Sequence, residues 1–279
     1  MDNYQKIFCS FGDSRMKKSL SRVKKQAKRM SIYDKIHICN ESMLAPEFSK
    51  YFEHQLKPNV RGFGYWCWKP QIILQCLQSM NDGDVLQYTD AGCHLNYQGR
   101  SRLLEYFDLA KVSDSGMVLF RPKMEYDAQG PKEVHRNFEY MYSKSDVLDH
   151  FNVLNDSNVT DSNQFMATAF FIRKDAKNID FIRLWIQTFT DDFTLIDDSP
   201  SRIDNHKNFV DHRHDQSIFS VMAKLKKVEE IDINEVFTYG DWNELKRFPI
   251  WTKRDKHFGF INYAKLQLYK IYASVFKKN

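Results

Sequence analysis

The sequence predicts an α/β protein with a mixed, mainly parallel central sheet flanked by helices, and three observations indicate this class. First, strand patterns at residues 6–10 and 35–39 enclose a basic helix pattern at about residues 15–30. A strand–helix–strand unit of this length is typical of parallel sheets. Second, a helix pattern at about residues 70–80 leads through a short turn into an apolar strand pattern at residues 85–89. Third, strand and helix patterns continue to alternate further along the chain.

The rest of the chain is expected to add further strands and helices to this sheet. Strand patterns lie at residues 117–120 and 165–172, and helix patterns at residues 143–151, 179–189 and 216–226. Residues 125–138 and 190–210 are expected to form long, irregular loops, which often carry binding residues. Because no repeat and no linker-like stretch divides the chain, we expect one domain at residues 1–260 and a short tail at residues 261–279.

The composition indicates a folded protein with a mild preference for anionic partners. Of 279 residues, 42% are hydrophobic and 15% are aromatic, which excludes a disordered or low-complexity chain. The net charge of +5 favours phosphates or acidic lipid head groups, although it is too small to name one partner. No apolar run is long enough to cross a membrane.

The cysteines indicate a reducing environment. All five lie in the first third of the chain, mostly in apolar runs and without a CxxC pair: Cys9, Cys39, Cys67, Cys76 and Cys93. Buried thiols explain this pattern best. Since no signal-peptide-like stretch is visible either, we expect a cytoplasmic protein.

Asp90 stands where the strand at residues 85–89 ends, and two small residues, Ala91 and Gly92, follow it. In open α/β sheets, ligands bind at this edge. A carboxylate at this position is suited to holding Mg²⁺ or Mn²⁺ against a diphosphate. The alternative, that Asp90 only caps the following turn, is equally consistent with its position.

The segment at residues 61–70 contains four aromatic side chains, two cations and two glycines, and it is not expected to form a plain helix. Its tryptophans, Trp66 and Trp68, offer flat faces for stacking on a sugar or a base. Its cations, Arg61 and Lys69, offer donors to phosphate. The alternative is an aromatic cluster that packs a loop onto the sheet, with a proline in the first turn of the next helix.

A polar cluster opens the helix predicted at residues 216–226. It consists of His212, Arg213, His214 and Asp215. Asp215 could be only the N-cap of this helix. Alternatively the cluster binds an anion, because a helix N-terminus and an arginine both favour negative charge.

The segment Tyr88-Thr89-Asp90-Ala91-Gly92 resembles the acidic motif of GT-A nucleotide-sugar glycosyltransferases, in which Asp-x-Asp holds a metal ion on the donor diphosphate. The resemblance implies a single GT-A (Rossmann-like) domain, a nucleotide-sugar donor, and Asp90 as a catalytic and metal-binding residue. The third position of the motif is Gly92 in this chain. Bound Mn²⁺ or Mg²⁺ would therefore need a ligand from elsewhere, or the enzyme would work without it.

Two further resemblances concern other segments. Residues 61–70 and 83–96 resemble a group of bacterial glycosyltransferases of surface polysaccharide synthesis (capsule or lipopolysaccharide), which place Gly-Tyr-Trp-x-Trp-Lys-Pro before an Asp-Ala-Gly strand end. Asp215 and Gln216 resemble the Asp-Gln element of retaining family 8 enzymes, which lies beside the donor sugar. The implied catalytic residues are Asp215, Gln216 and Asp90. The implied donor-binding residues are Ser10, Phe11, Asp13, Arg61, Trp68, Lys69, Asp90, Gly92, Arg213 and His214.

The same resemblances imply a glycan or lipid-linked acceptor. The acidic pair Asp197 and Asp198 also matches the bacterial group and could bind acceptor hydroxyls, although solvated loop carboxylates are commoner. His257 resembles a late metal-binding histidine of family 8, without the Lys-Pro-Trp that usually follows it. The basic amphipathic tail at residues 261–279 could lie on the inner face of a membrane, as in a peripheral enzyme, or pack on the domain.

Three other classes of function stay open. The cluster of His212, His214 and Asp215 could belong to a metal-dependent hydrolase, although its spacing differs from His-x-His-x-Asp-His and no second cluster accompanies it. The basic helix at residues 15–30 could bind nucleic acid, although such charges more often form a solvated face. A non-catalytic nucleotide-sugar binding protein is the third alternative. We expect an enzyme with no nucleic-acid partner.

Overall fold

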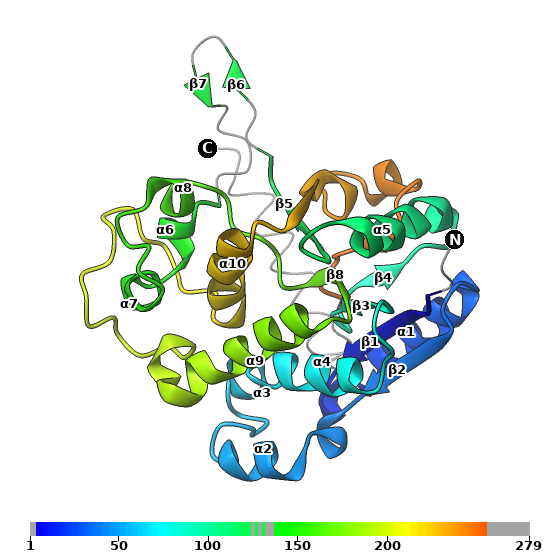
Figure 1. Ribbon diagram of the computed structural model, residues 1–279, viewed down its shortest axis with the longest axis horizontal. Helices are drawn as coiled ribbons and strands as arrows, with labels where there is room; N and C mark the ends of the chain where they lie inside the picture. Colours follow the sequence, from blue (N-terminus) through cyan, green and yellow to red (C-terminus); the bar gives the residue numbers. More distant parts are fainter. Residues whose placement is uncertain (1–3, 124–125, 128–129, 132–136, 256–279) are drawn as a thin grey trace, which may run out of the picture.

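The centre of the protein is a six-stranded sheet, seen in a computed structural model that describes residues 4–123, 126–127, 130–131 and 137–255 (Figure 1). The strands lie in the order β2 (Lys35–Cys39), β1 (Lys6–Phe11), β3 (Val85–Thr89), β8 (Ala169–Arg173), β5 (Met117–Arg121) and β9 (Glu229–Asp232). All neighbours run parallel except β8, which is antiparallel to both β3 and β5. The predicted mixed, mainly parallel sheet is confirmed.

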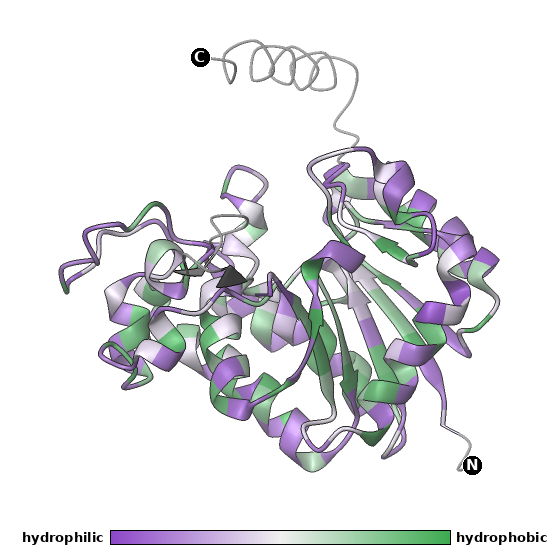
Figure 2. Ribbon diagram, turned by 90° about the horizontal axis from the view of Figure 1, so that it is seen from above, coloured by the Kyte–Doolittle hydropathy of each residue, from purple (hydrophilic) through white to green (hydrophobic). Residues whose placement is uncertain are grey.

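Helices cover both faces of this sheet, so the fold has three layers. One face packs against α4 (Trp68–Gln78), α9 (Ala176–Asp191) and α10 (Asp215–Lys226). The other face packs against α1 (Lys17–Met30) and α5 (Arg100–Val112). Figure 2 shows hydrophobic residues gathered where the helices meet the sheet. Because side chains alternate along a strand, each buried strand residue joins one of two cores, and Leu86 and Tyr88 of β3 face the α4 side.

Shorter elements complete the described part of the chain. The helices are α2 (Pro46–Tyr51), α3 (Gly62–Tyr65), α6 (Glu139–Tyr142), α7 (Ser145–His150) and α8 (Ser157–Thr160). The 3₁₀ turns are η1 (Ser14–Met16), η2 (Glu41–Met43), η3 (Tyr97–Gly99), η4 (Phe193–Leu195), η5 (Ile233–Glu235) and η6 (Trp242–Leu245). Two small antiparallel pairs are β4 (His94–Leu95) with β10 (Ile250–Trp251), and β6 (Tyr126–Asp127) with β7 (Gly130–Pro131).

The basic helix α1 is amphipathic and packs on the sheet. Its buried residues Leu20, Val23, Ala27 and Met30 recur at helical spacing, and most of its lysines and arginines face solvent. Arg22 is the exception, because its guanidinium donates to the carbonyls of Ala91 (2.9 Å) and Cys93 (3.3 Å). Helix α1 thus holds the turn after β3 in place. Arg22, one of the basic residues that suggested nucleic-acid binding, therefore has a structural role.

Two predicted boundaries differ from the structure. Helix α4 begins at Trp68, slightly before the predicted start, and Pro70 lies in its first turn as expected. The strand predicted at residues 165–172 is shorter, because β8 begins at Ala169. The backbone amide of Phe165 donates instead to the Ser220 hydroxyl of α10 (2.9 Å), and that of Met166 to the Phe120 carbonyl (2.9 Å).

The segment labelled α3 is not a right-handed helix. Five consecutive residues from Gly62 to Trp66 have positive φ angles between 52° and 90°, so the backbone makes a left-handed turn. Each non-glycine residue in this region costs roughly 1–2 kcal/mol. Gly62 and Gly64 lower that cost, because a glycine adopts positive φ freely. The prediction that residues 61–70 do not form a plain helix is confirmed.

No helix in the described part of the chain is long and apolar enough to span a membrane. The tail predicted at residues 261–279 and the candidate metal ligand His257 lie outside the described residues.

Candidate active site

The candidate site lies at the edge of the sheet where the parallel strands end. Strand β1 ends at Phe11 and β3 ends at Thr89, so Asp90 follows at this edge on the same face as Tyr88. Strand β8 runs the other way, and its first residues therefore reach the same edge, where the Asp90 amide donates to the Thr168 carbonyl (2.8 Å). Helices α4 and α10 both begin here, so two positive helix N-termini point at one place.

A buried lysine joins two carboxylates at the centre of the site. Lys69, in the first turn of α4, is 3% exposed. Its ammonium nitrogen lies 2.7 Å from Asp215 Oδ2 and 3.4 Å from Asp90 Oδ1, and it donates to the Ala167 carbonyl (3.2 Å). The Tyr88 hydroxyl also donates to Asp90 Oδ1 (2.7 Å). Residues from four separate segments are therefore held in one network.

Burial and charge set the protonation of this network. Burial lowers the pKa of Lys69, but attraction by Asp215 and Asp90 outweighs it, so the pKa is raised and the ammonium stays charged. Burial raises the pKa of the Asp215 carboxyl to about 6, and the Lys69 ammonium opposes that rise. Asp215 is therefore ionised at neutral pH but close enough to titration to respond to small changes in its surroundings.

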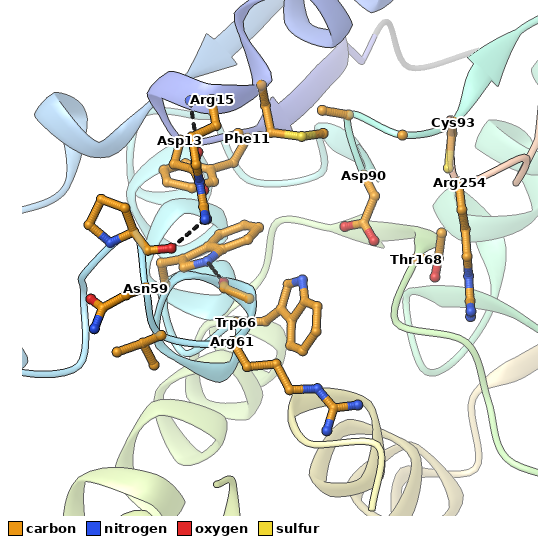
Figure 3. Close-up of a pocket in the computed structure, with 18 residues that line it drawn as sticks. Phe11, Asp13, Arg15, Asn59, Arg61, Trp66, Asp90, Cys93, Thr168 and Arg254 are labelled. Carbon is orange, nitrogen blue, oxygen red and sulfur yellow. Dashed lines mark hydrogen bonds and ion pairs between the residues drawn. The ribbon is translucent and has the colours of Figure 1, made fainter. Parts of the chain in front are cut away.

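A cavity of about 310 Å³ opens beside Asp90. In Figure 3, Asp90, Thr168 and Arg254 lie along one side of it, Asp13, Arg15 and Asn59 lie along the other, and Trp66 lies between them. The left-handed turn positions Trp66, whose ring lines the cavity. Trp68 stacks on Phe11, with ring centroids 4.0 Å apart, and its indole nitrogen donates to the Gly62 carbonyl (2.9 Å). The predicted aromatic packing therefore applies to Trp68, although this residue also lines the cavity.

Two more cavities continue from this one. A central cavity of about 320 Å³ shares Arg61, Trp66, Asp90, Thr168 and Arg254 with the first, and adds Lys69, Asp215 and Gln216. A third cavity of about 270 Å³ shares Arg213, Gln216 and Arg254 with the central one. Its other walls include the aromatic residues Phe237, Tyr239 and Trp242. The three cavities form one cleft, with the Lys69 network in the middle.

Arg213 and Arg254 give this cleft its positive charge. Arg254 lines all three cavities, and Arg213 lines the central and third ones. Neither guanidinium forms an ion pair with any carboxylate among the described residues. Arg213 is held by the side-chain oxygen of Asn137 (2.8 Å) and stacks 3.5 Å over the Tyr142 ring. Burial lowers the pKa of Arg213, and the charge of Arg254 lowers it further, so the two cations are close enough to repel each other. An anionic ligand would relieve that repulsion.

Gly92 explains how Arg254 reaches the cleft. A Cβ atom on Gly92 would lie 3.3 Å from the Arg254 Cα, and the Gly92 carbonyl accepts from the Asp255 amide (2.8 Å). A second aspartate at this position would therefore press on the backbone that carries Arg254. Gly92, where this chain lacks the second aspartate of the motif, is therefore the residue against which the segment that carries Arg254 packs.

The described residues do not match the donor set of a two-carboxylate metal site. Such a site needs hard oxygen ligands that are free to surround the cation. In the cleft, Asp90 and Asp215 are both in contact with the Lys69 ammonium, and two arginines stand beside them. Asp90 also accepts a hydrogen bond from the Tyr88 hydroxyl. Among the described residues, the single cluster with metal-ligand spacing lies elsewhere, at three cysteines. His257, the other predicted ligand, lies outside the described residues.

The two histidines before α10 hold a loop. His212 Nε2 lies 3.0 Å from the Leu195 carbonyl, and His214 Nδ1 lies 2.7 Å from the Ile196 carbonyl. Burial lowers the pKa of both rings, so they are neutral at pH 7. The described geometry gives no support to the hydrolase alternative. The N-cap alternative for Asp215 is wrong, because His214 occupies that position and Asp215 is the first helical residue.

Most predicted site residues come together in the cleft. Those that line it are Phe11, Asp13, Arg61, Trp68, Lys69, Asp90, Gly92, Arg213, His214, Asp215 and Gln216. Ser10 does not, because it is fully buried within β1 and lines none of the three cavities. Arg254 and Thr168 were missed, since no motif surrounds either of them. Asp198 of the acidic loop lies 3.0 Å from Arg61 and 3.7 Å from His214, at the rim.

The sequence matches no protein-family model, and no curated protein sequence matches it. Many solved structures align over most of the chain, and three of them are glycosyltransferases as follows. A glycosyltransferase involved in the glycosylation of the major capsid of PBCV-1 has 11% identity and a TM-score of 0.42, covering 89% of this chain and 94% of its own. Mouse xyloside xylosyltransferase 1 has 9% identity and a TM-score of 0.44, with coverages of 89% and 97%. The galactosyltransferase LgtC, in complex with donor and acceptor sugar analogs, has 10% identity and a TM-score of 0.42, with coverages of 88% and 86%. Similarity this weak assigns neither a family nor an activity.

Proposed function

We propose that this protein is a glycosyltransferase of the GT-A type, which moves a sugar from a nucleoside-diphosphate donor to a hydroxyl of a glycan. One observation carries the proposal. Lys69, Asp90 and Asp215 belong to three separate segments that each resemble nucleotide-sugar transferases, and their charged atoms meet within 3.4 Å in one cleft. Nothing in the sequence spacing of these segments requires them to meet. The contact between these three residues therefore supports the proposal independently of the resemblance.

The donor fits the cavity beside Asp90. Trp66 offers an aromatic face for the base or the sugar. Arg61 and Arg254 offer guanidinium groups for the diphosphate, and the small residue Gly92 leaves room for it at the strand end. Of these two cations, Arg61 is partly neutralised by Asp198, which lies 3.0 Å away, so Arg254 is the stronger candidate for the phosphate contact.

The chemistry is replacement at the anomeric carbon. The bond from that carbon to the diphosphate oxygen breaks, a bond to the acceptor oxygen forms, and the proton of the acceptor hydroxyl passes to the leaving diphosphate. Negative charge gathers on the leaving diphosphate, and preorganised cations in a closed cleft stabilise it. We assign this role to Arg254 and Arg213 rather than to Mn²⁺ or Mg²⁺, because the described carboxylates do not make a metal site.

We assign Asp215 and Gln216 to the reacting carbon. Both line the central cavity, between the proposed donor side and the third cavity. The Gln216 amide nitrogen donates to the Gln164 side chain (3.1 Å), which fixes its direction. An ionised Asp215 would stabilise positive charge that develops on the sugar ring in the transition state. The resemblance to retaining enzymes favours transfer with retention.

The third cavity is suited to the acceptor. Phe237, Tyr239 and Trp242 can stack on sugar rings, and Arg213 and Arg254 stand where this cavity meets the central one. This lining favours a glycan that carries an acidic group near the accepting hydroxyl. Such an acceptor is compatible with the surface polysaccharide role that the bacterial resemblance implies.

A nucleotide-sugar screen tests the proposal. Wild-type protein is incubated with uridine, guanosine and thymidine diphosphate sugars and with glycan acceptors, and release of nucleoside diphosphate is measured. Asp215→Ser should stay folded and lose turnover by roughly a hundredfold or more. The matched control Asp180→Ser, at an exposed aspartate on α9, should keep it. Failure of every donor in the wild type, or full turnover by Asp215→Ser with an active donor, would refute the assignment.

A further inference from the structure

Three cysteines from different elements meet inside the core, away from the cleft. Cys9 lies on β1, Cys39 on β2 and Cys76 on α4, and their sulfur atoms all lie within 4.8 Å of one another. The Cys9 and Cys76 sulfurs are 3.5 Å apart. Each of the three residues is at most 6% exposed. The expectation of buried, free thiols is therefore confirmed, but burial alone does not require three of them to converge.

We propose that Cys9, Cys39 and Cys76 form a binding site for a thiophilic metal ion, zinc in the first place, with His37 as the fourth ligand. Zinc binds thiolate sulfur at about 2.3 Å in a tetrahedral arrangement, which places neighbouring sulfurs about 3.8 Å apart. The observed triangle is close to that size, with one edge of 3.5 Å and no edge longer than 4.8 Å. Soft thiolate ligands of this kind favour zinc or cuprous ions over the hard cations that carboxylates bind.

His37 is the candidate for the fourth ligand. Its ring nitrogens do not lie within 4.8 Å of all three sulfurs, so its side chain would turn toward the metal ion on binding. His37 is the register partner of Cys9 on the neighbouring strand, and it lies two residues before Cys39, so it is on the same face of β2 as that thiol. Its Nε2 atom is buried and has no hydrogen-bond partner among the described residues. A buried ring nitrogen without a partner is costly, and a metal ion would satisfy it.

The thiols can also be reached from solvent. A hollow of about 160 Å³ leads to the cluster, and His37, Cys39, Met43 and Cys76 line it. Since Met43 is 47% exposed, this hollow is a path from solvent. Each thiol that binds the metal releases its proton to the solvent, and zinc bound by three thiolates and neutral His37 carries a net charge of −1.

The other two cysteines provide an internal comparison. Cys67 and Cys93 are equally buried, and burial raises the pKa of each thiol. Neither belongs to a cluster of possible metal ligands among the described residues. They should behave as packing residues in any metal experiment, which makes them matched controls for the cluster.

Cobalt titration of the full-length, reduced protein tests the site. After treatment with a chelator, wild-type protein should bind one equivalent of Co²⁺, with thiolate-to-cobalt charge-transfer absorption that added Zn²⁺ abolishes. Cys39→Ala and Cys76→Ala should lose this absorption, while Cys67→Ala and Cys93→Ala should keep it. Melting temperatures without metal show which variants are folded.

The wild-type spectrum keeps the test decisive even where a variant does not fold. Absence of charge-transfer absorption in wild-type protein at stoichiometric Co²⁺ would overturn the proposal, and so would an unchanged spectrum in a folded Cys39→Ala protein. His37→Phe retains the three sulfurs, so it should keep the charge-transfer absorption and shift the visible ligand-field bands. Unshifted bands would remove His37 from the ligand set. None of these results depends on the glycosyltransferase assignment.

Discussion

At the scale of single residues, the most informative contact is the ammonium of Lys69 between two carboxylates. Its long side chain is buried, and its charge is balanced by Asp215 at 2.7 Å and Asp90 at 3.4 Å. Removing one partner of a buried ion pair is costly because it leaves charge behind in a medium of low polarity. The same residue that organises the site is therefore expected to contribute to the stability of the whole chain.

Replacement of this cation should destabilise the protein. We expect Lys69→Met to lower the free energy of unfolding by roughly 3–5 kcal/mol, because it leaves Asp215 buried without a counter-charge. Denaturant unfolding of wild type and variant measures this. Lys177→Met, at an exposed lysine of α9, should change the free energy by less than about 0.5 kcal/mol. Equal effects of the two substitutions would mean that the Lys69 network is not a stabilising centre.

The protonation of Asp215 leads to a pH prediction. Its pKa is raised to about 6, mainly by burial, so in the folded protein the carboxyl becomes neutral as the pH falls below about 6. A neutral carboxyl cannot stabilise positive charge on the sugar. Turnover should therefore rise with pH through about 6 and level off above it, when measured with saturating donor. A rate that is flat across this range would contradict the role given to Asp215.

The sequence identified most of these residues but not all of them. Lys69, Asp90 and Asp215 stand in segments with recognisable patterns, so the sequence alone identifies each of them as a candidate site residue. Arg254 could not, because it lies in an irregular stretch and reaches the cleft only through the close packing of its backbone on Gly92. The sequence shows that residue 92 lacks a carboxylate. The location of the Arg254 guanidinium in the cleft, in contrast, depends on tertiary structure.

At the scale of elements, the left-handed turn from Gly62 to Trp66 is the most unusual feature. Phe63, Tyr65 and Trp66 all have positive φ, a conformation that costs energy for residues with side chains and is common at functional sites. The turn places Trp66 in the wall of the cleft. The two glycines and the density of aromatic residues were signals of an irregular segment, but the handedness of the turn follows from its packing.

Gly62→Ala should disturb this turn. A Cβ atom at residue 62 would lie 2.5 Å from the Trp66 ring, and the backbone φ of +61° is unfavourable for alanine. We expect a lower melting temperature and weaker donor binding, measured by thermal unfolding and calorimetry. In Gly240→Ala the added atom meets its neighbours at ordinary distances of 3.5 Å, so this control should behave like wild type. Normal donor binding by Gly62→Ala would show that the turn does not shape the site.

Two features of the sheet, strand β9 and the direction of strand β8, were not predicted from the sequence. Strand β9 has the sequence Glu-Glu-Ile-Asp, and acidic residues are poor strand formers. It is a strand because it pairs with β5 at the edge of the sheet, and edge strands tolerate charge. Strand β8 was recognised as a strand, but its antiparallel direction depends on the path of the chain between β5 and α9, which carries no short-range signal.

At the scale of the whole molecule, the proposed donor and acceptor sites lie in different parts of the cleft. Segments from the first part of the chain, at Phe11, Gly62 and Asp90, line the cavity assigned to the donor. Segments from the last part, at Ile233 and Trp242, line the cavity assigned to the acceptor. The start of α10 and Arg254 stand between them. The alternation of strands and helices was enough to predict this class of fold, while the continuity of the three cavities required the structure.

Calorimetric titration of wild-type protein with nucleoside diphosphates, in the presence of a metal chelator, tests most directly whether the arginines of the cleft bind a diphosphate. We predict that at least one nucleoside diphosphate binds under these conditions. Arg254→Met should weaken that binding roughly tenfold or more, which is about 1.4 kcal/mol, because it removes a charged contact to phosphate. Arg183→Met, at an exposed arginine of α9, should leave it unchanged. If binding occurs only when Mn²⁺ or Mg²⁺ is restored, or if Arg254→Met binds as tightly as wild type, the assignment of the diphosphate to the arginines of this cleft is wrong.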